Sequence, residues 1–248
     1  MTRFSIPVEP ILPYLLNEGP VATPFVELTG TVFRMGSLNR KDEQPLRDIR
    51  LNPFAVALTP VTNSEYAIFL ADTGHESPRF WDDPRFNDPA SPVVGVSWFD
   101  AEAYCAWLGG LLARHCRLPT EAEREYAACG EILNSLFPWG NDPWDEGLFA
   151  FGSAGMDRPQ PVGSTPPNGF GLYHMAENVH EWCSDWYAEN YDSDDLDNPG
   201  GPIKGMRRAS RGGSWRHRVK VTRFTARSSL LPDWQYNDYG FRVYADSC

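Results

Sequence analysis

The side chains of this chain that could do chemistry gather in one stretch, from Phe170 to Tyr187, which reads FGLYHMAENVHEWCSDWY. Its possible ligands and hydrogen-bonding groups are His174, Glu177, Asn178, His180, Glu181 and Asp185. Two imidazoles with a carboxylate are the ligand types of non-haem iron sites, so a metal centre drawn from His174, Glu177, His180 and Glu181 is one hypothesis. On a regular helix, however, His174 and His180 would lie about 120° apart, and one face would not present both.

The same stretch supports a structural interpretation. Its large apolar residues are Phe170, Tyr173, Trp182, Trp186 and Tyr187. Aromatic side chains bury large areas and bring their N–H and O–H groups to partners, so a run rich in tryptophan and carboxylate also holds several loops together. The polar groups would then be architectural, and we favour this interpretation from the residue types alone.

Composition narrows the class of protein. The chain has 248 residues, 22 basic and 33 acidic, for a net charge of −11. A surplus of negative charge argues against duplex nucleic acid or an anionic membrane as partner. The N-terminal residues are interrupted by prolines and lack the apolar core of a signal peptide, and no run is long enough to span a bilayer. Five cysteines suggest no disulfide framework, so a reduced, cytoplasmic protein is expected.

Three short helices should position these groups. Each begins at a capping box, in which a Ser or Thr is followed three residues later by Glu or Asp. The three stretches are TNSEYAIFLADTG from Thr62, WFDAEAYCAWLGG after Ser97, and TEAEREYAACG from Thr120. Gly74 and Gly130 are expected to end the first and the third of these helices. Cys105 falls on the apolar face of the middle helix, so we expect it in the core.

The remaining chain predicts short strands and much ordered loop. Residues 25–36 alternate as a strand or hairpin with Gly30 at the bend, and residues 51–58 form a second apolar run. Residues 75–92 are rich in proline, Asp and Asn, which indicates an ordered surface loop. After Gly130 the chain has no long periodicity, so its backbone groups must find partners within loops. We expect an irregular arm at residues 1–24 and a single domain at residues 25–248.

A series of motifs resembles the formylglycine-generating enzyme family, also called the sulfatase-modifying-factor domain. These motifs are FRMGS at 33–37, PVTNSEYAIFL at 60–70, PVVGVSWFDAEAYCAWL at 92–108, RLPTEAEREYAA at 117–128, FPWGND at 137–142, PVGSTPPNGFGLYHMAENVHEW at 161–182, RGGSW at 211–215 and YGFRV at 239–243. The resemblance implies an α+β, loop-rich domain of C-type-lectin-like topology, with short capped helices, small antiparallel sheets and a groove built partly by the C-terminal segment.

The resemblance does not extend to the family's copper site. Active members have two cysteines shortly after the GGS motif, which hold Cu(I) as thiolates. The matching stretch here, WRHRVKVTRFTAR at 215–227, contains no cysteine, and Arg216, His217 and Val219 fall near the expected positions. Copper-dependent formylglycine formation is therefore not expected, although His217 could bind another metal.

Calcium is the one cofactor that the resemblance leaves open. The family pattern for one calcium site maps onto His174, Glu177, Asn178 and Glu181, with Glu181 retained. His174 replaces an oxygen ligand and Glu177 replaces a glycine, which weakens the match to a hard cation. The second calcium site maps near Ala150 and Phe151 and lacks its Asn, so we expect no metal there.

The C-terminal segment is the predicted binding surface. Nine Lys or Arg residues lie between Lys204 and Arg227 in an otherwise acidic chain. They either form a solvated face paired with the acidic loop at residues 189–197, or bind a polar or anionic ligand or a partner protein. Arginine and aromatic residues dominate binding hot spots. The candidate ligand-binding residues are therefore Trp215, Arg216, His217, Arg218, Lys220, Arg223, Trp234, Tyr236 and Tyr239.

Two functions follow as alternatives. The favoured one is a binding module that uses this C-terminal groove. Because RGGSW and YGFRV also frame the variable region of diversity-generating-retroelement proteins, residues 216–238 would be such a variable stretch in one version of this hypothesis. The alternative is a metal- and oxygen-dependent oxidoreductase of the same family with a site built without cysteine.

Overall fold

A computed structural model describes residues 24–130, 135–141, 156–192, 194–217 and 221–247. The predicted N-terminal arm, residues 1–24, lies outside this part of the chain except for its last residue. Within it, short helices and small sheets are joined by long loops, so the expected α+β class is confirmed. None of the helices in these ranges is long and apolar enough to cross a membrane.

Each predicted helix is present and begins at its capping box. The helices are α2 (Asn63–Thr73), α3 (Trp98–Leu112) and α4 (Glu121–Cys129). In each, the cap hydroxyl accepts from the backbone N–H three residues on, and the Glu or Asp there accepts from the N–H of the cap residue. Gly74 ends α2 in the left-handed conformation. Such caps contribute about 1 kcal/mol each, so local sequence is enough to fix where these helices begin.

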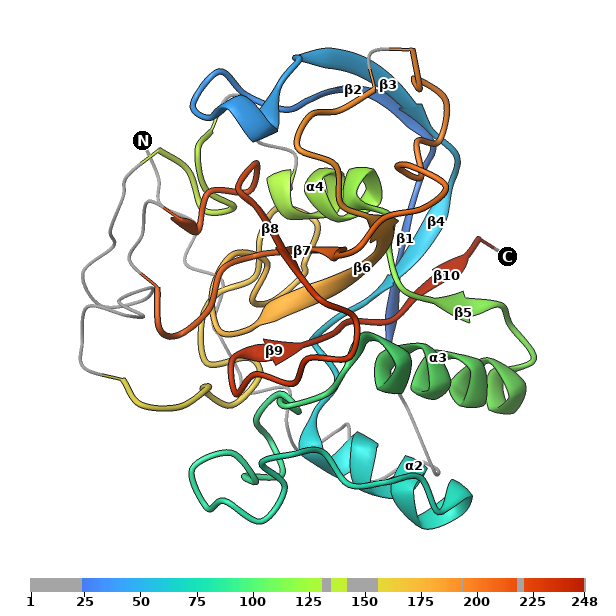
Figure 1. The fold of residues 1–248 in the computed structure, drawn as a ribbon, viewed down its shortest axis with the longest axis vertical. Coiled ribbons are helices and arrows are strands. Elements are labelled where there is room, and N and C mark those ends of the chain that lie inside the picture. The colour runs from blue at the N-terminus through green and yellow to red at the C-terminus, as the bar shows by residue number, and fades with distance from the viewer. Residues whose placement is uncertain (1–23, 131–134, 142–155, 193, 218–220, 248) are drawn as a thin grey trace, which may run out of the picture.

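The sheet at the centre of the molecule brings together segments from the last third of the chain (Figure 1). Its order is β8–β7–β6–β9, formed by β6 (His180–Trp186), β7 (Arg208–Arg211), β8 (Arg227–Leu230) and β9 (Tyr239–Gly240). β7 pairs antiparallel with both β6 and β8, whereas β9 pairs parallel with β6. This parallel pair departs from the antiparallel sheets that were expected. It sets His180 opposite Tyr239, next to Asp238.

Residues 25–36 form strands on either side of Gly30, as one of the two predicted alternatives requires, but these strands do not pair as a hairpin. β1 (Phe25–Leu28) and β2 (Thr31–Met35) flank Gly30 but belong to different sheets. β2 pairs with β3 (Arg47–Leu51), and a 3-10 turn at Lys41–Glu43 lies between them. β1 joins the sheet β1–β4–β10–β5, with β4 (Phe54–Ala57), β5 (Cys116–Arg117) and β10 (Tyr244–Asp246). Alternation and a central glycine indicate strands and a bend but not the pairing partner, which is why the sequence predicted either a strand or a hairpin here.

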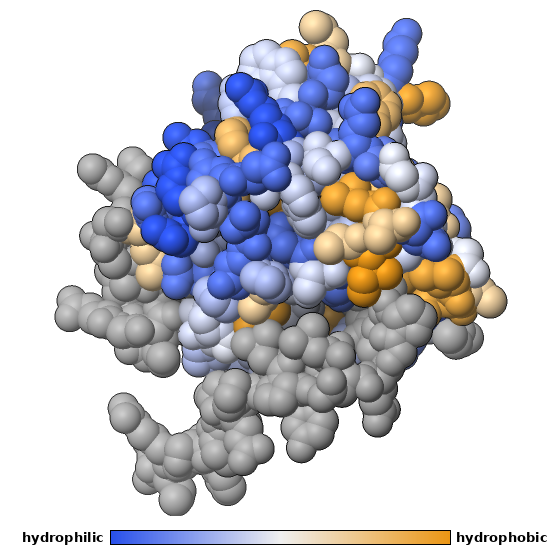
Figure 2. Space-filling model, turned by 90° about the horizontal axis from the view of Figure 1, so that it is seen from below, coloured by the Kyte–Doolittle hydropathy of each residue, from blue (hydrophilic) through white to orange (hydrophobic). Residues whose placement is uncertain are grey.

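Two apolar clusters fill the space between these layers. The first packs α2 and α3 against the sheets and includes the fully buried Tyr66, Tyr104, Cys105 and Phe241. Cys105 is therefore a core residue, as predicted. The second lies between α4 and the strands β2 to β4, around Ile49. Figure 2 views the molecule from below, the direction in which α2 lies in Figure 1. The described surface in this view is largely hydrophilic, and its hydrophobic residues gather on the right of the picture.

Candidate functional site

A pocket of about 350 Å³ opens beside the edge strand β8, and we call it the β8 pocket. Strand β8 contributes Arg227, Ser228 and Ser229, and other parts of the chain contribute Arg40, Asp42, His180, Tyr187, Arg207, Gly212, Gly213, His217, Val221 and Ala226. The volume is within the range typical of ligand sites. Gly212 and Gly213 have φ of 102° and 69°, and a Cβ on Gly213 would lie 3.0 Å from the Thr222 side chain. The two glycines therefore let the backbone pass close to the pocket wall.

Three ligand-type side chains converge at one wall of this pocket. They are His180, His217 and Asp238, whose possible ligand atoms all lie within 4.8 Å of one another; we call them the His–His–Asp cluster. The rings of His180 and His217 have centroids 4.9 Å apart. Burial, with smaller effects of His217 and Arg124, lowers the pKa of His180 to about 3. Burial also lowers the pKa of His217. Both imidazoles are thus neutral at physiological pH.

The residues of the predicted calcium group, His174, Glu177, Asn178 and Glu181, are held in hydrogen bonds with one another or with other parts of the protein. His174 Nδ1 lies 2.9 Å from Glu177 Oε1, and its Nε2 accepts from the backbone N–H of Gly163 at 3.0 Å. The Asn178 side chain bonds to the backbone of Gln160 in both directions. His180, which the sequence grouped with His174, instead faces His217 and Asp238. Gathering the four residues around one ion would break these contacts.

Glu181 lies in the centre of the domain between two arginines. Its Oε2 accepts from Arg124 Nε at 2.7 Å, and its Oε1 accepts from Arg242 Nη2 at 3.0 Å. All three side chains are at most 1% exposed. Burial alone would raise the pKa of Glu181, but Arg124 and Arg242 outweigh this effect and lower it. The structural interpretation of the 170–187 stretch holds for this carboxylate, while calcium binding stays an untested prediction.

Several arginines of the basic C-terminal segment point inward and do not form a solvated face. Arg211 and Arg227 both donate to Glu121, and Arg223 forms two hydrogen bonds of 2.7 Å to Glu43. The acidic loop at residues 189–197 is instead held by strand β3. Arg47 donates to the backbone oxygens of Asp192 and Asp195, and Arg50 pairs with Asp197. The basic segment does reach this loop at Tyr191, whose hydroxyl accepts from Arg211, but the buried ion pairs described for the segment are with carboxylates outside the loop.

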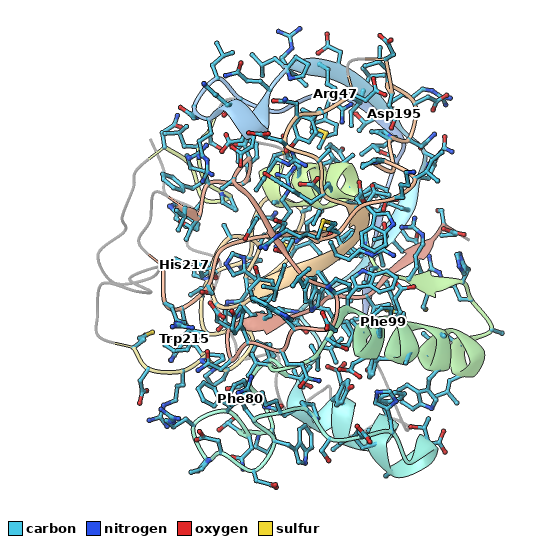
Figure 3. The ribbon with its side chains drawn as sticks, viewed as in Figure 1. Arg47, Phe80, Phe99, Asp195, Trp215 and His217 are labelled. Atoms are coloured by element: carbon cyan, nitrogen blue, oxygen red, sulfur yellow. The ribbon has the colours of Figure 1, made fainter. Side chains whose placement is uncertain are left out.

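The remaining predicted binding residues divide into exposed and buried groups. Arg216, Trp234 and Tyr236 are exposed, with 42% of Trp234 accessible. Trp215 and Tyr239 are buried, as is Arg223, and Arg218 and Lys220 lie outside the described residues. Ring contacts connect the exposed group to the pocket through a row that we call the aromatic row, formed by Trp234, Tyr236, Tyr239, His180 and His217. Figure 3 shows Trp215 and His217 together on one side of the molecule.

A second pocket of about 210 Å³ lies at the N-terminus of α4, where Arg47 and Asp195 are labelled in Figure 3, well away from His217. Asp185 lines it and accepts from the Glu121 backbone N–H at 3.0 Å, which caps the helix. Burial, and next the neighbouring Glu121 carboxylate, raise the pKa of Asp185 to about 7. Folding thus keeps a proton on this carboxyl at a pH where an exposed aspartate has lost it.

We expect the advantage of an Asp185→Asn variant over the wild type to grow as pH rises from about 4 to about 7. The unfolded chain releases the Asp185 proton near a pKa of 3.8, whereas the folded chain keeps it up to about 7. In this window the unfolded state binds fewer protons, so wild-type stability falls by up to about 1.4 kcal/mol per pH unit from this group. Asparagine lacks the charge and keeps an acceptor for the Glu121 N–H.

Urea unfolding of both proteins between about pH 5 and about pH 8 measures this difference. The exposed Asp233 supplies the matched control, Asp233→Asn, which should follow the wild type. A constant offset between wild type and Asp185→Asn across the whole range would contradict the prediction.

No cysteine among the described residues lines the β8 pocket. Cys105, Cys116, Cys129 and Cys183 are free and buried. Burial raises the pKa of all four thiols. They are therefore protonated at physiological pH, whereas the thiolate is the form that binds a metal.

Comparison with known proteins assigns residues 17–247 to the model of the sulfatase-modifying factor enzyme 1-like domain. The formylglycine-generating enzyme of Mus musculus is 32% identical over 297 residues, covering 93% of this chain and 78% of that protein. The structure of PvdO from Pseudomonas aeruginosa matches with a TM-score of 0.80 and 30% identity, over 90% of this chain and 94% of that one. The motifs read from the sequence are thus confirmed as family motifs.

Treponema denticola variable protein 1 also has a TM-score of 0.80, at 24% identity, over 90% of this chain and 95% of that one. This likeness shows the fold alone, and it confirms the expected C-type-lectin-like architecture. Within residues 216–238, Arg223 and Arg227 are held in buried ion pairs, whereas Arg216, Trp234 and Tyr236 are exposed. Sequence variation in this stretch stays a prediction; among its described residues, exposed positions such as Trp234 and Tyr236 could change without breaking buried contacts.

Proposed function

The chain belongs to the family of sulfatase-modifying factor enzyme 1-like domains, and from this premise we propose that it is a binding module whose β8 pocket holds an acidic segment of a partner protein. Family membership leaves the activity open, because one fold carries several functions. The buried, protonated thiols support a role other than copper-dependent formylglycine formation.

The observation that carries the proposal is the charge at the pocket. Arg40 pairs with Asp42, and Arg227 pairs with Glu121, so these charges are compensated. Arg207 is exposed and donates to the hydroxyl and carbonyl oxygens of Ser229, which are neutral. Among the described residues it has no ion pair with a carboxylate. A carboxylate from a ligand would supply the missing countercharge in a bidentate contact.

The position of the pocket suits an extended polypeptide. β8 is the edge of its sheet, and its residues Ser228 and Ser229 line the pocket. An edge strand leaves outward backbone groups available, and an extended segment pairs with them in many recognition domains. Backbone pairing would supply affinity, and Arg207 would supply selectivity for an acidic side chain.

The exposed end of the aromatic row extends this surface. Trp234 and Tyr236 are each about two-fifths exposed, and the centroids of their rings are 5.7 Å apart. Arg216 is half exposed beside them, with its Nη1 3.2 Å from Asn237 Oδ1. Trp, Tyr and Arg are the residue types enriched in binding hot spots, so these three side chains are the expected contacts for residues flanking the acidic one.

Selection of a random-peptide phage library on the immobilised protein, followed by calorimetry of one enriched peptide, tests the proposal. We expect enriched peptides to contain Asp or Glu, and Arg207→Ala or Trp234→Ala to weaken binding by roughly tenfold or more. Arg50→Ala is the matched control, since Arg50 is an exposed arginine that does not line the pocket. Enrichment of peptides without acidic residues, or equal affinity of Arg207→Ala and wild type, would overturn the proposal.

A further inference from the structure

We propose that the His–His–Asp cluster binds one divalent first-row transition-metal ion at the wall of the β8 pocket. The cluster shares His180 with the metal group considered from the sequence, but its other two members, His217 and Asp238, come from later parts of the chain. The inference stands independently of the peptide-binding function, because it concerns the metal alone.

The fold itself brings the three residues together. His180 begins β6, and its backbone N–H donates to the Asp238 carbonyl at 2.9 Å, at the start of the parallel pairing with β9. His217 lies in the turn after the two glycines, where its N–H donates to the Ser214 carbonyl at 2.9 Å. Possible ligand atoms therefore converge within 4.8 Å, although the residues are far apart in sequence.

A buried nitrogen without a partner points independently to a ligand. His180 is 6% exposed, and its Nδ1 is buried with no hydrogen-bond partner among the described residues. A buried polar atom without a partner destabilises the folded state, so such atoms are rare in folded proteins.

The donor set selects the class of ion. Two imidazoles and one carboxylate suit iron, zinc, cobalt or nickel in the divalent state, whereas calcium prefers oxygen ligands only. Three protein ligands leave further coordination positions, and these would face the β8 pocket because His180 and His217 line it. The ion would therefore be reachable by water or by a ligand held in the pocket.

Neighbouring groups already orient two of the ligands. The Ser214 hydroxyl donates to Asp238 Oδ2 at 3.0 Å and lies 3.4 Å from His217 Nδ1. Contacts of this kind fix the ligands of metal sites. A bound ion needs ligand atoms about 3 Å apart, so the cluster must contract slightly, which the half-buried His217 permits. Arg216, 3.7 Å from Asp238 Oδ1, opposes a cation, but it is half exposed and can turn toward solvent.

Titration of the metal-free protein with Co²⁺, followed by visible absorption and by metal analysis after desalting, tests the proposal. We expect one ion per chain, absorption bands of a low-coordinate Co²⁺ site, and displacement by Zn²⁺. His217→Ala should weaken Co²⁺ binding by at least about tenfold without changing the thermal unfolding temperature, since His217 is only half buried. Asp238→Asn should weaken it as well.

The matched control is His115→Ala. His115 also lies 2.8 Å from a carboxylate oxygen, of Asp246, but it is exposed and has no second histidine beside it. This variant should bind Co²⁺ as the wild type does. No retained ion in the wild type, or an ion retained equally in His217→Ala, or lost in His115→Ala, would overturn the assignment. Peptide binding without metal would leave the proposed function intact, so the two proposals fail separately.

Discussion

Replacing Glu181 with alanine should lower the free energy of unfolding by about 3 to 5 kcal/mol. The carboxylate accepts hydrogen bonds from Arg124 and Arg242, and all three side chains are at most 1% exposed. Without Glu181 two buried guanidinium groups would keep their charge and lose their counterion. The destabilisation would come from this uncompensated charge more than from the lost contact itself. Urea unfolding at neutral pH measures it.

The exposed pair Arg34–Asp48 provides the comparison. Its two hydrogen bonds are 2.9 Å long, similar to those of Glu181, but more than half of each side chain is accessible. Solvent screens exposed ion pairs, so Asp48→Ala should change the free energy of unfolding far less than Glu181→Ala does. Losses of equal size in the two variants would show that burial does not set the strength of the Glu181 network.

Replacing Glu121 with glutamine should lower the unfolding temperature by roughly 6 to 20 °C. Glu121 lies at the start of α4 and accepts from Arg211 at 2.9 Å and from Arg227 at 2.6 and 2.8 Å. It joins α4 to β7 and β8 in the middle of the domain. Burial alone would raise the pKa of Glu121, but Arg227 and Arg211 outweigh this effect and lower it. Glutamine keeps the volume and removes the charge, so the change isolates the electrostatic contribution.

Glu27→Gln is the matched control for this substitution. Glu27 also pairs with an arginine, Arg114 at 2.7 Å, but about half of its side chain is exposed. Calorimetric scans of the two variants should differ by most of the predicted shift. If Glu121→Gln unfolds within a degree or two of Glu27→Gln, the buried network stabilises the domain far less than its geometry indicates.

The sequence predicted those features that depend on near neighbours. The three helices begin where a hydroxyl and a carboxylate three residues apart satisfy the first backbone N–H groups, and this pattern needs no knowledge of the fold. Cys105 was placed in the core because helical spacing puts it beside other apolar residues. The family motifs then gave the architecture, which helix periodicity alone would not have done.

The sequence could not predict contacts between distant residues. Arg223 is hydrogen-bonded to Glu43, which is 180 residues away in the sequence, and Arg211 is hydrogen-bonded to Glu121, which is 90 residues away. The charge count along the chain predicted that the basic segment forms a solvated or ligand-binding face, but several of its arginines are buried in ion pairs inside the domain. For the same reason His180 was grouped with His174, whereas the strand pairing places it beside Asp238. The sequence signal for Asp238 as a site residue was its position directly before the YGFRV motif.

The place of β10 in the fold has a consequence for how the protein is made. Tyr244–Asp246 lies between β4 and β5, pairing with both, and β9 has just joined β6. During synthesis, β5 and one edge of β4 therefore have no strand to pair with until residues 244–246 have left the ribosomal exit tunnel. The four-stranded sheet can therefore close only after residues 244–246 have been synthesised, so this part of the domain completes its folding late, after most of the domain has already emerged.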